Sequence, residues 1–195
     1  MSVNFDYALP FIRLHEGGWV HDPADAGKET FAGISRANWP KWSGWPTIDG
    51  VKASMGTSPA YGTTAYYNWV ARLDKLLAPI LSLQSAVSQF YEQNFWKIAW
   101  DRLDKRVAAK VMDLSVNNGA TWGPRILQRA LGVVDDGIVG AITIVGANGT
   151  DTDALLAAMC GKLKQHYAEI VAAHPGDSRF LANWNERAAW IPPVA

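Results

Sequence analysis

Apolar residues near the start of the chain recur at the spacing of an amphipathic helix. Phe5, Leu9 and Ile12 fall on one face, so we expect a short helix over residues 5–16. Pro10 predicts that its first turn is irregular. A pair of glycines follows at once, and this pair ends the helix because glycine favours the backbone conformation of a helix C-cap.

The next two segments lack a helical period. Residues 19–34 combine turn residues with scattered Val, Thr, Phe and Ile, which predicts a small β-hairpin or an irregular ribbon. Residues 35–62 are broken by prolines and glycines, so we expect a long loop with at most one short helix. This loop includes the sequence WPKWSGW, whose three tryptophans share no helical face and are therefore expected to be exposed.

The rest of the chain is a succession of helical patterns. We expect helices over residues 63–78, 83–98, 104–116, 123–131, 138–147, 153–173 and 178–189. The predicted fold class is therefore mainly α (α+β), with a small β-hairpin after the first helix. A chain of this length is expected to form one domain, 1–195, or to divide into residues 1–100 and 101–195.

Composition excludes several classes of function. The formal net charge is zero, so no overall field attracts nucleic acid or an anionic membrane. No stretch approaches the roughly 18 apolar residues of a membrane span, and the first residues lack the pattern of a signal peptide. We therefore expect a monomer made in a cytoplasm, with no nucleic-acid partner and no stable membrane insertion.

Few residues are suited to bind a metal or form a disulfide. Cys160 is the single cysteine and is expected to be buried in a helix. His15 and His21 flank a turn at a spacing that does not fit a zinc site, and the acidic residues do not fit a calcium loop. We therefore expect neither a metal nor any other cofactor.

Ten tryptophans are several times the ordinary number for a chain of 195 residues. Such rings pack protein cores, and they also stack on the apolar faces of sugars or on bases. The group formed by Trp39, Trp42 and Trp45 leaves two interpretations open. Either at least one ring contacts a glycan, or the three form a small core that anchors the long loop.

The stretch HEGGWVHDPADAGKETFAGI gathers acids and glycines at the expected end of the first helix. Glu16 falls at the helix C-terminus, where the partial negative charge of the helix disfavours a second carboxylate. Glu16 is therefore a candidate for an acid that keeps its proton and donates it to a leaving group. The alternative is an ordinary helix end in water.

Hydrolysis of a glycosidic bond also requires a second carboxylate on a separate element. Asp22, Asp25 and Glu29 are candidates on the hairpin, and the hydroxyl of Thr30 is suited to orient a water. For Asp22, a structural turn before Pro23 is the alternative.

This stretch resembles the opening motif of glycoside hydrolase family 108, a lysozyme-like N-acetylmuramidase family common in phages and bacteria. The matching residues are Glu16, Gly17, Gly18, Trp19, Asp22, Pro23, Asp25, Gly27, Thr30, Gly33 and Ile34. Lys28 and the Phe31-Ala32 pair depart from the pattern of the family, and neither departure changes the acids.

A second stretch, KVMDLSVNNGATWGPRILQRALGVVDDGIVGAITI, is similar to the C-terminal part of that family, which is often described as a predicted peptidoglycan-binding region. Ala141 stands where a proline is usual. The resemblance covers about residues 5–34 and 85–175, and it leaves residues 40–80 uncovered.

The resemblance implies a lysozyme-like fold that cleaves the β-1,4 bond after N-acetylmuramic acid. Glu16 matches the catalytic glutamate of the family. Asp25 and Thr30 resemble the other members of a Glu–Asp–Thr set, although the gap between them is one residue shorter than in phage-type lysozymes.

Four further positions are candidates for contact with the substrate. Asn117 and Asp113 match a region that lines the cleft in this family, and Trp19 and Asp22 lie within the opening motif. For Asn117, a helix C-cap is a compatible alternative.

The implied partner is the glycan strand of peptidoglycan. The implied setting is a phage endolysin that stays in the host cytoplasm until a holin opens the membrane and that then acts on periplasmic peptidoglycan. The alternatives are a lytic transglycosylase, a non-catalytic binding module on the same fold, and a virion-associated protein that degrades the wall.

Overall fold

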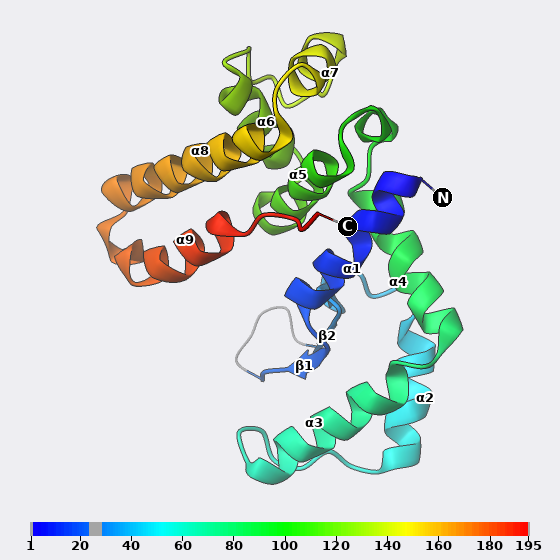
Figure 1. The fold of residues 1–195 in the computed structure, drawn as a ribbon. Helices are drawn as coiled ribbons and strands as arrows, with labels where there is room; N and C mark the ends of the chain where they lie inside the picture. Colours follow the sequence, from blue (N-terminus) through cyan, green and yellow to red (C-terminus); the bar gives the residue numbers. More distant parts are fainter. Residues whose placement is uncertain (1, 24–28, 195) are drawn as a thin grey trace. The chain divides into compact units, whose positions relative to one another are not determined.

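The computed structural model describes residues 2–23 and 29–194 of the chain (Figure 1). Two compact units are present: Arg13–Asn94 form one, and Met1–Ile12 with Phe95–Ala195 form the other. Helices dominate both units, and a small antiparallel sheet follows the first helix. The predicted mainly α fold class is therefore confirmed.

The first helix, α1 (Val3–Glu16), ends at the glutamate that the sequence singled out. Its first turn is regular, because the hydroxyl of Ser2 accepts a hydrogen bond of 3.1 Å from the N–H of Phe5. Pro10 lies inside the helix, so the prediction of an irregular first turn is wrong. Phe5 and Ile12 are fully buried on either side of the proline, and this packing offsets the missing backbone hydrogen bond.

The segment predicted as a hairpin forms three antiparallel strands instead of two. They are β1 (Trp19–His21), β2 (Glu29–Phe31) and β3 (Ile34–Ser35), in that order. The register leaves Ala32 and Gly33 as a two-residue turn between β2 and β3, and both have positive φ, 47° and 76°. Positive φ at both positions is the geometry of a type I′ turn, which matches the twist of the two strands.

Three helices complete the same unit. They are α2 (Trp45–Met55), α3 (Thr64–Leu77) and α4 (Leu81–Asn94). Trp45 is the first residue of α2 and is buried, so the expectation that it lies on an exposed loop is wrong. Pro46 suits this place, because the N–H that proline lacks has no helical partner in a first turn.

The other unit is built from helices. It contains η1 (Ile98–Arg102), α5 (Lys105–Asn118), α6 (Trp122–Leu131), α7 (Ala141–Asn148), α8 (Thr152–Ala173), η2 (Pro175–Phe180) and α9 (Leu181–Ala189). The predicted buried face of α5 is confirmed, because Val107, Val111 and Leu114 are at most 1% exposed. Cys160 on α8 is also buried, as expected.

Two buried polar side chains hold this second unit together. The ammonium of Lys110 on α5 donates to the carbonyls of Ala188 and Trp190, at 3.1 and 2.5 Å, and burial lowers the pKa of Lys110. Gln128 on α6 donates to the carbonyl of Ile138 at 2.9 Å and accepts from the N–H of Gly137 at 2.9 Å. These bonds fix the end of α9 and the loop before α7.

Candidate functional site

The carboxyl group of Glu16 lies against the turn between β2 and β3. Glu16 is half-buried, and a Cβ atom built on Gly33 would fall 2.7 Å from its Oε2 atom. The same Cβ atom would fall 2.5 Å from the hydroxyl oxygen of Tyr91. The helix end, the turn and a tyrosine of α4 therefore meet at one place, and only a residue without a side chain fits between them.

Tyr91 holds this turn in position. Its side chain is 1% exposed, and its hydroxyl donates a hydrogen bond of 2.7 Å to the carbonyl of Ala32. Ala32 has a φ of 47°, a conformation that costs energy for a residue with a Cβ atom. The bond from Tyr91 helps to offset that strain, so α4 positions the backbone against which the Glu16 carboxyl rests.

The open face of the sheet carries two hydroxyl groups. Thr30 on β2 is paired in register with Ser35 on β3 and with Val20 on β1, so their side chains share one face. Thr30 and Ser35 are half-buried, whereas Phe31 and Ile34 point to the opposite, buried face. Ser35 was not singled out from the sequence, and its pairing with Thr30 makes it a further candidate.

Of the two aspartates that were predicted on the hairpin, the structure describes only Asp22. Asp25 lies outside the described residues, so its predicted role stays a prediction. Asp22 is half-buried, and a hydrogen bond between its side chain and that of Tyr61 raises the pKa of Tyr61. This contact gives Asp22 a structural role, and contact of Asp22 with the substrate stays a prediction.

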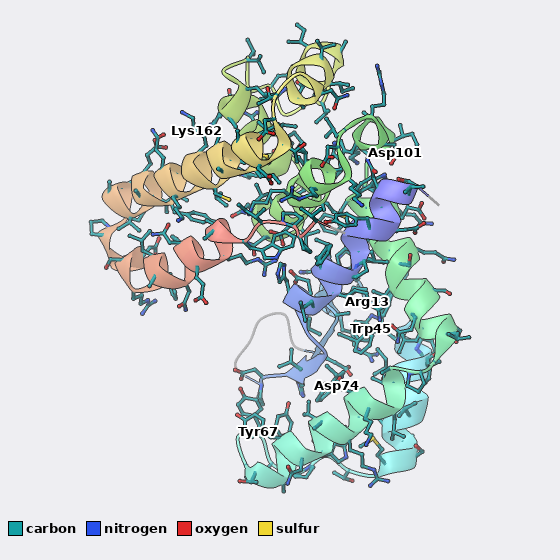
Figure 2. All side chains as sticks on the ribbon, in the orientation of Figure 1. Arg13, Trp45, Tyr67, Asp74, Asp101 and Lys162 are labelled. Carbon is teal, nitrogen blue, oxygen red and sulfur yellow. The ribbon has the colours of Figure 1, made fainter. Side chains whose placement is uncertain are left out.

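Helix α3 fixes both ends of β1. The Oδ1 atom of Asp74 accepts a hydrogen bond of 2.7 Å from the N–H of Trp19, and the hydroxyl of Tyr66 donates one of 2.8 Å to the carbonyl of His21. Asp74 is labelled on α3 in Figure 2. A Cβ atom on Gly18 would lie 2.3 Å from Oδ2 of Asp74, so the carboxylate packs directly on the glycine. Burial raises the pKa of Asp74, and the hydrogen bond from Trp19 acts in the opposite direction.

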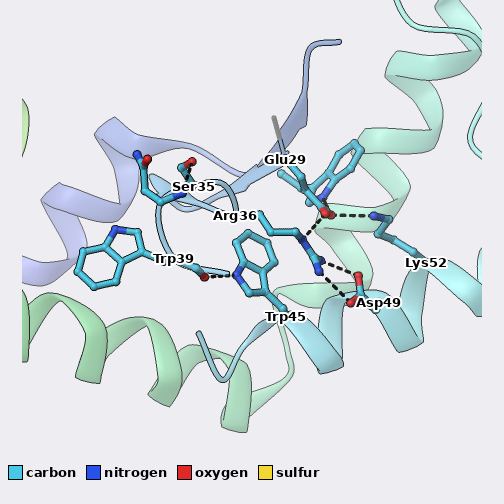
Figure 3. A network of polar contacts seen from close by, with 9 residues as sticks. Glu29, Ser35, Arg36, Trp39, Trp45, Asp49 and Lys52 are labelled. Atoms are coloured by element: carbon cyan, nitrogen blue, oxygen red, sulfur yellow. Dashed lines mark hydrogen bonds and ion pairs between the residues drawn. The ribbon is translucent and has the colours of Figure 1, made fainter. Parts of the chain in front are cut away.

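Glu29 is the centre of a charged network beneath the sheet (Figure 3). Its carboxylate accepts from the indole N–H of Trp19 at 2.6 Å and pairs with Arg36 at 2.6 Å and Lys52 at 2.7 Å. A carboxylate engaged by three donors in this way is poorly placed to serve as a second catalytic acid. Arg36 also forms a two-pronged ion pair with Asp49, at 2.6 and 3.1 Å, which extends the network to α2.

This network also defines the environment of Trp19. The ring is 4% exposed, and the ammonium of Lys52 lies 5.2 Å from its centroid. With its N–H donated to Glu29, Trp19 acts as a packing residue under β1. A contact between Trp19 and the substrate stays a prediction.

The other two predicted residues belong to the C-terminal unit. Asp113 is fully buried, and its Oδ1 atom pairs with Arg187 at 3.1 Å, so its carboxylate positions that arginine. Asn117 borders a hollow of about 400 Å³. The other residues around this hollow are Asn118, Tyr167, Ile170, Asn183, Trp184 and Arg187. Substrate binding by Asn117 and Asp113 stays a prediction.

Two further properties follow from the parts of the chain that the structure describes. Among those residues, no group of three or more His, Cys, Asp or Glu side chains is arranged to hold a metal ion. No described helix combines the length and the apolar character that crossing a bilayer requires.

Comparisons with known proteins identify two regions. Residues 9–119 match the family model of Glycosyl hydrolase 108, and residues 123–189 match that of the Predicted Peptidoglycan domain. The solved structure of Brucella abortus SagA has a similar fold, with a TM-score of 0.51 and 23% sequence identity over 94% of this chain and 92% of that one. A comparison with curated proteins gives no match.

Proposed function

Because the chain belongs to glycosyl hydrolase family 108, we propose that it cleaves the β-1,4 bond between N-acetylmuramic acid and N-acetylglucosamine, with Glu16 as general acid. The family match shows a glycoside hydrolase, and the match over residues 123–189 supports peptidoglycan as its substrate. What we propose is which bond is cleaved and which residue donates the proton.

The observation that carries the proposal is the placement of the Glu16 carboxyl. A general acid must lie within hydrogen-bond reach of the oxygen that it protonates, so its carboxyl has to be held in place. Gly33 allows the backbone of the turn to lie against this carboxyl, and Tyr91 holds the turn through Ala32. Groups fixed by packing and hydrogen bonds in this way support a catalytic side chain better than a loose loop does.

The proposed reaction uses one proton and one water. Glu16 gives its proton to the glycosidic oxygen as the bond from that oxygen to C1 of the muramic acid breaks. The water adds its oxygen to C1 and gives a proton to the second carboxylate, so the products are a reducing muramic acid end and a free hydroxyl on the next sugar. That proton then returns to Glu16 through solvent. Thr30 orients the water, and Asp25 supplies the second carboxylate.

Mass spectrometry of the soluble fragments after digestion of purified peptidoglycan tests the proposal. We expect new reducing N-acetylmuramic acid ends. Products lighter by one water, which carry an anhydro ring, would replace the hydrolase with a lytic transglycosylase. Free amino groups from the peptide stems without new reducing ends would contradict glycosidase activity altogether, and binding without any product would indicate a non-catalytic module.

The setting of the enzyme is a further part of the proposal. The resemblance to a family common in phages supports an endolysin that is held in the host cytoplasm and reaches periplasmic peptidoglycan after a holin opens the membrane. Expression in a Gram-negative host should then cause lysis only when a holin is co-expressed. Equal lysis without the holin would contradict this setting and leave the bond specificity untouched.

A further inference from the structure

A hollow distinct from the one beside Asn117 lies within the unit that carries Glu16, between α4 and the loop that contains Trp39 and Trp42. Its volume is about 480 Å³, and the loop over residues 38–43 forms one wall. The other wall is the face of α4 that carries Gln89 and Gln93. Of its lining residues, Pro40, Lys41, Trp42 and Ser43 fall in the part of the chain that the sequence resemblance left uncovered.

The three tryptophans of the loop have different environments, and only one is suited to contact a ligand with much of its ring. Trp45 is 2% exposed, whereas Trp39 is 42% exposed. Trp42 is intermediate, and its indole N–H donates to the carbonyl of Ala86 at 3.3 Å. Trp42 and Trp45 therefore form the small core that anchors the loop, and Trp39 remains at the surface on the wall of the hollow.

Trp39 is held rigidly in this place. Its carbonyl accepts a hydrogen bond of 2.8 Å from the indole N–H of Trp45, as Figure 3 shows. Its ring meets Phe90 edge to face, with centroids 5.0 Å apart and an interplanar angle of 88°. A Cβ atom on Gly44 would lie 2.2 Å from the ring of Trp42, so close packing also fixes the base of the loop. A ring fixed in this way loses little conformational entropy when a ligand binds.

The polar groups around Trp39 are mostly amides. Gln89 and Gln93 are exposed and lie four residues apart on α4, so both extend along the same wall. Asn38 lines the opposite wall, and Lys41 is the single charged side chain among the lining residues. Amide groups both donate and accept hydrogen bonds, which suits the hydroxyl and acetamido groups of a neutral sugar. A phosphate or carboxylate ligand would call for several cations instead.

We propose that this hollow is a glycan subsite that binds an N-acetylated hexosamine, with the apolar face of the sugar on Trp39 and its polar groups on Gln89 and Gln93. The identity of the glycan rests on the function proposed above. The loop that lines the hollow is tied to the end of β3, where the N–H of Trp39 donates to the carbonyl of Ser35 at 2.9 Å.

Titration of the full chain with N-acetylchitotetraose tests the subsite. The Glu16→Gln variant is used so that no turnover occurs, and binding is followed by calorimetry and by NMR of the side-chain N–H groups. We expect shifts of the Trp39 indole signal and of the Gln89 and Gln93 amide signals. Trp39→Ala should raise the Kd about fivefold, as expected for loss of one aromatic contact.

Tyr67 provides a matched control, since it is another exposed aromatic side chain of the same unit and does not line the hollow. Tyr67→Ala should leave the Kd unchanged. The double variant Gln89→Ala/Gln93→Ala should weaken binding without any change in Tm, because both side chains are exposed.

An unchanged Kd in Trp39→Ala would overturn the subsite. So would shifts of these signals with a free stem peptide but not with the glycan, which would make the hollow a peptide site. These results are independent of the muramidase proposal: binding that depends on Trp39 in a chain that cleaves no glycan would leave the subsite standing and remove the function.

Discussion

A methyl group on Gly33 would fall 2.7 Å from the Oε2 atom of Glu16, which is well inside van der Waals contact. Gly33→Ala should therefore displace the Glu16 carboxyl as well as strain a backbone with a φ of 76°. We expect a stability loss of about 1–2 kcal/mol from the backbone and a fall in kcat of at least about tenfold from the displaced acid. Turnover of soluble glycan and thermal unfolding measure the two effects.

Gly62 is the control for that substitution, because its φ is 81° and a Cβ atom there would meet nothing within 4 Å. Gly62→Ala should lower the Tm to a similar extent, because it strains the backbone in the same way, and it should leave kcat unchanged. Equal losses of kcat in both variants would mean that Gly33 acts through stability alone.

Tyr91→Phe tests whether the turn positions the acid. The variant keeps the ring and removes the hydrogen bond of 2.7 Å to the carbonyl of Ala32. Leaving that carbonyl without the bond should cost about 1–3 kcal/mol of stability, and kcat should fall while KM changes little.

Tyr66→Phe is the matched variant, since its hydroxyl also donates to a strand carbonyl, that of His21 at 2.8 Å. It should lower the Tm to a similar extent with a smaller effect on kcat. If the two variants lose kcat equally, the role of Tyr91 is general stability of the sheet.

Glu16→Gln removes the proton donor and preserves the size of the side chain. Activity should fall by at least about a hundredfold, the lower range of general-acid contributions, with the Tm close to that of the unchanged protein. Glu169→Gln makes the same carboxyl-to-amide change on α8 and should have no effect. Activity of the Glu16 variant within about tenfold of the unchanged protein would be inconsistent with an essential general acid.

The raised pKa of Asp74 predicts that the free energy of unfolding depends on pH. Burial raises its pKa above the ordinary value of 3.8, so between 3.8 and the raised pKa the folded chain holds more protons than the unfolded chain. The contribution of this group to the free energy of unfolding is therefore full below pH 3.8 and is lost as the pH rises through the raised pKa.

Asp74→Asn makes this contribution measurable. The amide oxygen of the variant can still accept the N–H of Trp19, and it carries no charge to desolvate. The stability of the variant relative to the unchanged protein should increase as the pH rises through that window and then stay constant. Denaturant unfolding at several pH values gives this difference, and a difference independent of pH would contradict the assignment.

Local patterns predicted the parts of the site that local forces determine. The place of Glu16 at the end of α1 follows from its own helix and the glycines after it, and the structure has it there. The sequence pattern places Trp45 on a loop because no helical period precedes it, although Pro46 in the first turn of α2 is a signal that a helix begins.

Distant contacts were missed for a physical reason. Tyr91 meets Ala32 across 59 positions of the sequence, and Asp74 meets Trp19 across 55. Nothing in the local spacing of a tyrosine or an aspartate on a helix indicates which strand it will hold. The glycines were the available signal, since Gly18 and Gly33 both mark places where another side chain lies against the backbone.

Helix α4 carries Tyr91 toward the turn and Gln89 and Gln93 toward the hollow. Each residue along a helix is rotated by about 100° from the one before it. Deleting or inserting one residue between Gln89 and Tyr91 would therefore separate these two functions, whereas exchange of a residue that faces neither the turn nor the hollow would not. In evolutionary terms, the length of this segment should be fixed among functional relatives, while its positions that face neither the turn nor the hollow are free to drift.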